Sequence, residues 1–174
     1  MKTLLLLRHA KSAWSDPGLD DHDRPLNGRG ERSAKAMADH IARRGPRPDL
    51  ILCSTAMRTR QTLAPLLKRL GGPAPPISLE NGLYLASEDV LLAHIRAVAD
   101  GVPTVLLIGH NDGIGQLAAD LAGSGPAEAL AALGEKYPTG ALAVLRLPNG
   151  PWSDLKPGAA ELLEFVRPRD LAVT

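Results

Sequence analysis

Arg8 and His9 stand side by side, directly after the short apolar segment 3–7. A run this short, with no polar alternation, is typical of a strand buried on both faces of a sheet. Such strands belong to parallel α/β sheets, where ligands bind just beyond the carboxyl ends of the strands. A guanidinium and an imidazole at that point are suited to chemistry on an anion.

Two further apolar segments end in side chains of the same kind. Segment 50–53 leads through Ser54 to Arg58, one turn into the predicted next helix, and segment 104–108 is followed within two residues by His110. The carboxyl ends of parallel strands lie along one edge of a sheet, so we expect the two arginines and two histidines to converge. Guanidinium groups match phosphate oxygens in a bidentate way, so the set predicts a site for a phosphoryl group.

The elements that must position these residues alternate between strands and helices. Asn27 is expected to cap a helix that ends before Gly45, Ser54 a helix to about Leu70, and Ser87 a helix that ends near Asp100. Further helices are predicted around 114–121 and within 124–135, and further strands at 77–79, 141–147, 152–155 and 160–166. This order predicts a three-layer α/β/α sandwich with a mostly parallel mixed sheet, in one domain spanning 1–174.

Composition excludes several classes of function. The formal net charge is +1 and aromatic residues make up 3%, which disfavours a nucleic-acid-binding protein. No apolar run reaches membrane-spanning length, so no membrane partner is expected. Cys53 is the single cysteine, which excludes an intrachain disulfide and favours a reducing cytoplasmic location. The sequence leaves the oligomeric state open.

Three motifs, in order along the chain, resemble those of the histidine phosphatase superfamily, the phosphoglycerate-mutase-like proteins. The Arg-His-Ala of segment 8–10 resembles the family's Arg-His-Gly signature. Segment 54–62 resembles the second motif, and the Gly-His pair at 109–110 resembles the third. Segment 21–26 and the Leu-Tyr pair at 83–84 look most like the SixA-type phosphohistidine phosphatase branch.

The resemblance implies a phosphatase that works through a phosphohistidine on His9. His9 would attack phosphorus as a neutral imidazole, and nearby arginines would lower its pKa and keep the lone pair free. Arg8, Arg58 and His110 would hold the phosphoryl oxygens and stabilise their charge in the transition state. Water would then hydrolyse the intermediate. No cofactor and no metal are implied, because the expected cations are already arginines.

The sequence departs from the family pattern at two points. Ala10 replaces the usual glycine, a change of one methyl group that a backbone with negative φ would tolerate. Glu80 is the best match for the family's acid/base carboxylate, although the SixA branch is known for lacking this acid. Arg24 and Ser15, in the loop after the first strand, are expected as further substrate contacts. Without a strong acid, a phosphohistidine substrate would be favoured, because imidazole leaves with less help than an alkoxide.

The sequence leaves two kinds of substrate and two rival functions to compare. Short insertions between the strands leave the site open, which suits a phosphorylated protein side chain, whereas a small phosphoester usually needs more enclosure. One rival is a non-catalytic phosphoprotein-binding module, which would have no use for His9. The other is a cysteine phosphatase, but four residues separate Cys53 from Arg58 where that loop needs five, and none of them is glycine.

Overall fold

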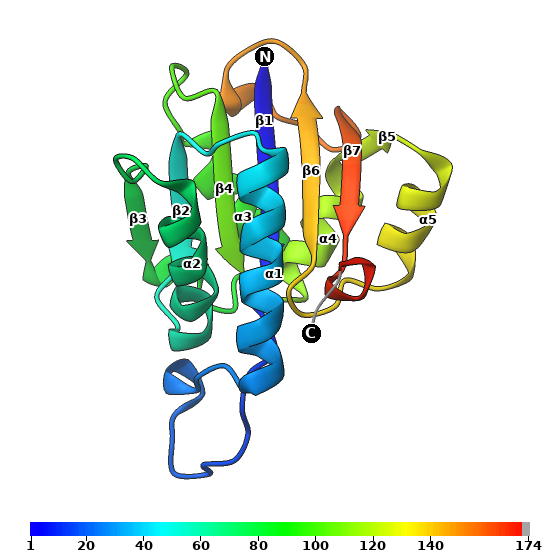
Figure 1. The fold of residues 1–174 in the computed structure, drawn as a ribbon. Helices are drawn as coiled ribbons and strands as arrows, with labels where there is room; N and C mark the ends of the chain where they lie inside the picture. Colours follow the sequence, from blue (N-terminus) through cyan, green and yellow to red (C-terminus); the bar gives the residue numbers. More distant parts are fainter. Residues whose placement is uncertain (172–174) are drawn as a thin grey trace.

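A single mixed sheet of seven strands, in the order β3-β2-β4-β1-β6-β7-β5, forms the centre of the molecule (Figure 1). The computed structural model describes residues 1–171. Strands β1 to β4 are mutually parallel, β6 is antiparallel to both β1 and β7, and β5 is parallel to β7. The strands are β1 (Lys2–Arg8), β2 (Leu50–Ser54), β3 (Ile77–Glu80), β4 (Thr104–Gly109), β5 (Ala122–Ser124), β6 (Leu142–Leu147) and β7 (Ala160–Val166).

Strand β1 is buried on both of its faces and precedes a polar exit. Leu4 and Leu6 point into the hydrophobic core on one face, and Leu5 and Leu7 into the core on the other. Successive strand side chains alternate between faces, so four leucines in a row contribute equally to both cores. The uninterrupted apolar run therefore predicted the two-sided burial of this strand.

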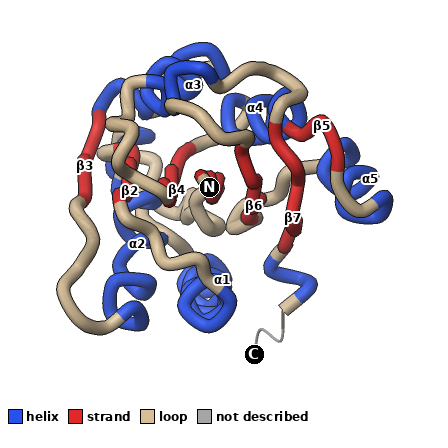
Figure 2. The backbone as a smooth tube through the Cα atoms, turned by 90° about the horizontal axis from the view of Figure 1, so that it is seen from above, coloured by secondary structure: helices blue, strands red, loops and turns tan. Residues whose placement is uncertain are grey.

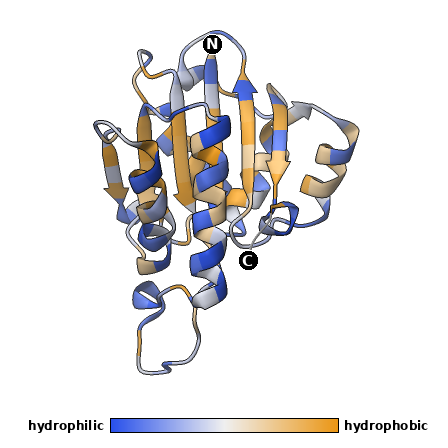
Figure 3. Ribbon diagram, in the orientation of Figure 1, coloured by the Kyte–Doolittle hydropathy of each residue, from blue (hydrophilic) through white to orange (hydrophobic). Residues whose placement is uncertain are grey.

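Helices cover both faces of the sheet and complete the three layers (Figure 2). Helices α1 and α2 lie on one face, α3 and α4 on the other, and α5 lies beside the β5 edge (Figures 1 and 2). Hydropathy colouring shows hydrophobic residues along the central strands, whereas hydrophilic and hydrophobic residues alternate along α1 (Figure 3). The helices are α1 (Gly28–Arg44), α2 (Met57–Leu70), α3 (Glu88–Arg96), α4 (Gly113–Leu121) and α5 (Ala127–Glu135).

Two of the predicted helix caps are confirmed. The Gly30 amide donates to Asn27 Oδ1 at 2.8 Å, and the Val90 amide donates to Ser87 Oγ at 3.4 Å. Gly30 is also required for packing, because a Cβ there would lie 1.9 Å from the carbonyl oxygen of Lys11. The first turn of α1 is thereby held against the segment that follows β1.

The structure corrects three expectations about local structure and adds one strand. The stretch around Trp152 is a 3-10 helix (Trp152–Asp154) and not a strand, because the fully buried indole donates to the carbonyl of Val102 at 2.8 Å and anchors a tight turn. The N-cap position of α2 is Ala56, which makes no side-chain cap, because Ser54 is still part of β2. Helix α3 ends at Arg96, well before Asp100. The three-residue strand β5 was not predicted, since Ala-Gly-Ser carries no strand signal.

Within residues 1–171, no helix combines the length and the apolar character needed to cross a membrane.

Candidate active site

The parallel strands β1, β2 and β4 end at one edge of the sheet, where the structure forms a cavity of about 300 Å³. Arg8 and His9 follow from β1, Arg58 from the first turn of α2, and His110 from the end of β4. All four line this cavity, together with Arg24 from the loop after β1. The convergence predicted from the strand exits is therefore present in the structure.

His9 is held in one tautomer by the backbone. Its Nδ1 lies 2.7 Å from the carbonyl oxygen of Ala10, and since a carbonyl only accepts, Nδ1 carries the proton. This leaves the lone pair on Nε2. The His9 ring is 6% exposed, and its centroid lies 5.3 Å from that of His110. A fixed imidazole with a free lone pair is the form that a nucleophile needs.

The surroundings also keep the imidazole neutral. Desolvation by burial lowers the pKa of His9 to about 4, and the charges of Arg58, Arg8 and Arg24 act in the same direction. The hydrogen bond to the Ala10 carbonyl opposes them. Desolvation likewise lowers the pKa of His110 to about 3, with His9 and Arg58 contributing. Both rings are neutral at pH 7.

Ala10 fits its position without strain. Leu85 is the only non-glycine residue of the described chain with a positive φ, so the backbone at Ala10 has a negative one. The Ala10 amide donates to Thr62 Oγ1 at 3.0 Å, and its methyl group is fully buried against Leu26 and Ala34. The position tolerates the methyl group, as the sequence predicted for a negative φ.

Asp21 bonds two of the arginines that line the cavity, Arg24 and Arg58. Its Oδ2 accepts from Arg58 Nη2 at 2.9 Å, its Oδ1 accepts from Arg24 Nη1 at 2.7 Å, and its backbone carbonyl accepts from Arg58 Nη1 at 2.7 Å. The Tyr84 hydroxyl also donates to Oδ2. Burial acts to raise the pKa of Asp21, but the hydrogen bonds from Tyr84, Arg58 and Arg24 outweigh it and hold that pKa well below its ordinary value.

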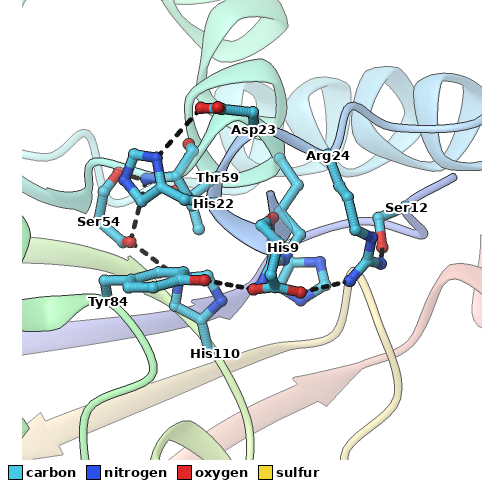
Figure 4. A network of polar contacts seen from close by, with 12 residues as sticks. His9, Ser12, His22, Asp23, Arg24, Ser54, Thr59, Tyr84 and His110 are labelled. Carbon is cyan, nitrogen blue, oxygen red and sulfur yellow. Dashed lines mark hydrogen bonds and ion pairs between the residues drawn. The ribbon is translucent and has the colours of Figure 1, made fainter. Parts of the chain in front are cut away.

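The same polar network extends to both sides of His9 (Figure 4). On one side, His110 Nε2 lies 2.8 Å from Ser54 Oγ. On the other, Arg24 Nη2 donates to Ser12 Oγ, and the Arg24 guanidinium carbon lies 3.2 Å from the ring centroid of Trp14. These contacts fix the orientation of Arg24 and His110 around the cavity.

Two buried nitrogens at the site lack a hydrogen-bond partner among residues 1–171, namely Arg8 Nε and His110 Nδ1. Both belong to residues that line the cavity. A buried polar group without a partner costs free energy, and such a group is worth explaining where it occurs. An anion bound in the cavity would offer acceptors on the side where these residues lie.

Two of the predicted site residues lie elsewhere. Glu80 is the last residue of β3; its carboxylate accepts from Ser78 Oγ at 2.6 Å and does not line the cavity. Ser15 is exposed and also does not line it, while Ser12, three residues earlier, does. His22, His40 and His94 also lie outside the lining, and His40 pairs with Glu164 at 2.9 Å.

Cys53 is unsuited to nucleophilic chemistry. It is fully buried in the core on the α1–α2 face of the sheet, and burial raises the pKa of its thiol to about 12. Because a thiolate and not a thiol is the nucleophile, this disfavours the cysteine phosphatase reading, as the sequence spacing did.

Known proteins are similar to the part of the chain that contains Arg8, His9 and Arg58. The model of the histidine phosphatase superfamily (branch 1) matches residues 4–84, the part of the chain from β1 to Tyr84. An uncharacterized protein of Mycobacterium tuberculosis H37Rv is 42% identical over 165 residues, which cover 94% of this chain and 100% of that protein.

Two similar solved structures are described as the putative phosphohistidine phosphatase SixA. The one from Nakamurella multipartitia has a TM-score of 0.82 and 34% identity, over 96% of this chain and 96% of that chain. The one from Agrobacterium tumefaciens has a TM-score of 0.79 and 36% identity, over 95% of this chain and 97% of that chain. The chain belongs to the histidine phosphatase superfamily. The resemblance to the SixA-like branch is thereby confirmed, along with the phosphoglycerate-mutase-like fold.

Sequence reasoning missed the central position of Asp21 and the contact of Tyr84 with it. The segment that contains Asp21 carried part of the family resemblance, but only Arg24 was taken from it as a site residue. Four acidic residues in the same polar loop gave no means of choosing among them. The available signal was the spacing of Asp21 and Arg24. Asp21 begins a one-turn helix and lies three residues before Arg24.

Proposed function

We propose that the protein is a phosphatase that transfers a phosphoryl group to His9 and then to water. The observation that carries the proposal is the state of His9: neutral, locked with its lone pair on Nε2, and placed in a cavity with Arg8, Arg24 and Arg58. Its membership in the histidine phosphatase superfamily supports the same reading.

In the first step, the lone pair of His9 Nε2 attacks phosphorus, and the bond from phosphorus to the leaving atom breaks. The leaving atom takes that electron pair, while the His9 ring becomes a cationic phosphohistidine. The charge on the phosphoryl oxygens is stabilised by the guanidinium groups of Arg8 and Arg58 and by a donor on His110. These groups are placed before substrate arrives, which spares reorganisation during the reaction.

In the second step, a water oxygen attacks the same phosphorus, the N–P bond breaks, and the pair returns to His9 Nε2. Inorganic phosphate leaves with the proton of the attacking water transferred to solvent. The Ala10 carbonyl retains the Nδ1 proton through both steps, since it can accept from the neutral ring and from the cationic one. Neither step requires a metal ion or a cofactor.

The leaving group follows from the carboxylates around the site. Glu80 is engaged by Ser78, and Asp21 is held ionised by two arginines and a tyrosine, so neither is placed to protonate an alkoxide. The imidazole of a phosphohistidine leaves with less assistance. We therefore favour a phosphohistidine on a protein as the substrate, in agreement with the assignment of the two solved relatives.

The exposed surface at the cavity and the expected location of the protein both fit a phosphohistidine protein as substrate. Trp14 and Leu85 line the cavity and are 78% and 54% exposed, so apolar surface is available to a protein that presents the phosphoryl group. A reducing cytoplasm remains the expected location on the ground of the single cysteine. Residues 1–174 are taken as one functional domain.

The test uses a phosphohistidine peptide and p-nitrophenyl phosphate with the wild type, His9→Ala and His94→Ala. His94 lies on α3 and bonds the carbonyl of Val90, so it serves as a matched histidine outside the cavity. We expect release of phosphate by the wild type and His94→Ala, and none above background by His9→Ala. Equal rates for all three proteins would contradict the proposal, and tight binding without turnover would favour the phosphoprotein-binding module.

A further inference from the structure

A second cavity, of about 260 Å³, adjoins the candidate active site. Lys11 and Thr139 line both cavities. The remaining lining comes from the start of α1, the end of α5 and the 3-10 helix Pro168–Asp170. Nothing in the phosphoryl transfer proposed above uses this cavity.

The lining of this cavity is strongly basic in a chain that is nearly neutral. The whole chain has 20 Lys and Arg against 19 Asp and Glu. The cavity lining includes one carboxylate, Glu135, and five cations, which are Lys11, Arg29, Lys136, Arg167 and Arg169. Arg167 is engaged by Asp170 at 3.0 and 3.1 Å. The other four have no carboxylate oxygen within 4.0 Å among residues 1–171.

A serine hydroxyl adds a further donor to the lining of this cavity. Ser33, on α1, lines the cavity and is 7% exposed. Its hydroxyl makes no hydrogen bond within the described part of the chain and can donate to a ligand in the cavity. A hydroxyl and several guanidinium and ammonium groups form a donor set that is suited to phosphate or carboxylate oxygens.

The position of this cavity relative to His9 is fixed by the backbone. The amide of Gly140, next to Thr139, donates to the carbonyls of His9 at 2.8 Å and Arg8 at 3.1 Å. On the other side, the Asn27 amide donates to the Lys11 carbonyl at 3.0 Å and holds the start of α1. The two cavities therefore keep a constant separation, as a substrate with two anionic groups requires.

We propose that the second cavity is a subsite for another anionic group of the same substrate, beyond the phosphoryl group that is transferred. This inference rests on the proposed phosphatase function and deepens it. The anion has one of two sources: an acidic side chain near the phosphohistidine in a protein, or a second phosphate in a small bisphosphate. In either case, the subsite selects among substrates that all carry a transferable phosphoryl group.

The test uses the double charge reversal Arg29→Glu/Arg169→Glu. Both side chains are exposed, and a glutamate in the first turn of α1 is favoured by the helix dipole, so the variant is expected to fold. Lys35→Glu/Lys68→Glu makes the same charge change with two exposed lysines outside the cavity. One arm compares phosphohistidine peptides with flanking glutamates or glutamines as substrates. The other compares fructose 1,6-bisphosphate with fructose 1-phosphate as competitive inhibitors of p-nitrophenyl phosphate turnover.

In the cavity variant we expect a roughly tenfold rise in the KM for the glutamate peptide, in the Ki for the bisphosphate, or in both, with little change in the control. The arm that responds identifies the source of the anion. Turnover of p-nitrophenyl phosphate, which has one anionic group, stays unchanged in both variants. If neither arm responds while that turnover persists, the subsite is overturned and the phosphatase function stands. Loss of all turnover in the wild type would overturn the phosphatase function itself.

Discussion

Arg58 is bound to Asp21 through both of its terminal nitrogens, to the Oδ2 atom at 2.9 Å and to the backbone carbonyl at 2.7 Å. The guanidinium that is proposed to hold the phosphoryl group thus has a carboxylate as its partner. A bound phosphoryl group must share or replace that partner. Asp21 therefore both positions the arginine and weakens the positive potential at the site.

Removal of this negative charge strengthens anion binding. We predict that Asp21→Asn lowers the Ki for inorganic phosphate by roughly tenfold, because the charges of Arg58 and Arg24 are no longer offset. Inhibition of p-nitrophenyl phosphate turnover measures this. Asp23→Asn is the matched control, since Asp23 contacts His22 and neither arginine. A Ki that stays constant or rises would mean that Asp21 acts only by positioning.

Because burial and nearby arginines keep the His9 imidazole neutral, we expect it to gain a proton only at low pH. With a folded pKa of about 4, the ring stays unprotonated well below the ordinary value of about 6.5. The unfolded chain binds a proton between these values and the folded protein does not, so the free energy of unfolding falls as the pH falls through this window. NMR of 15N-histidine-labelled protein gives the midpoint directly. Arg58→Gln should raise it, whereas a wild-type midpoint above pH 6 would contradict the electrostatic account.

The methyl group of Ala10 contributes to stability and not to chemistry. Ala10→Gly restores the family's usual residue but removes a buried methyl and adds backbone freedom, so we expect the free energy of unfolding to fall by about 1 kcal/mol. Urea denaturation measures the change. The rate of phosphate release should be retained, because the Ala10 amide and carbonyl still bond Thr62 and His9. A large loss of turnover at unchanged stability would assign the methyl group a role in the site.

The position of Glu80 predicts that it is not the general acid of the reaction. Its carboxylate bonds Ser78 and lies outside the cavity lining, so Glu80→Gln should leave phosphate release from a phosphohistidine peptide within roughly twofold of the wild type. Removal of a general acid would instead lower the rate by about 100-fold or more. A loss of that size, with unaltered folding, would show that Glu80 reaches the leaving group.

Much of the fold followed from the sequence because its signals were local and agreed with one another. The apolar segments before Arg8, Ser54 and His110 are strands, and their shared direction brought the polar exits together. The segment near Trp152 was misassigned because its apolar residues fit a strand, while a single indole hydrogen bond to a distant carbonyl favours a turn. That contact spans 50 residues, and no local pattern reports it.

The site was predictable where a residue sits at a strand end, and less so in loops. His9, Arg8 and His110 are placed by backbone elements, so their convergence followed from topology. Asp21 and Tyr84 meet only because the loop after β1 folds back over the cavity, across 63 residues of sequence. Loop geometry of this kind depends on tertiary contacts that spacing does not encode.

The account depends most on His9 as the atom that receives the phosphoryl group. Rapid acid-free quenching of the wild type during turnover of a phosphohistidine peptide, followed by mass spectrometry of the digested protein, locates the transferred group. We predict an added phosphoryl group on His9 that appears within one turnover and decays as free phosphate forms. Phosphate trapped on any other residue, or phosphate release with no phosphorylated protein under conditions that preserve phosphohistidine, would contradict the central claim.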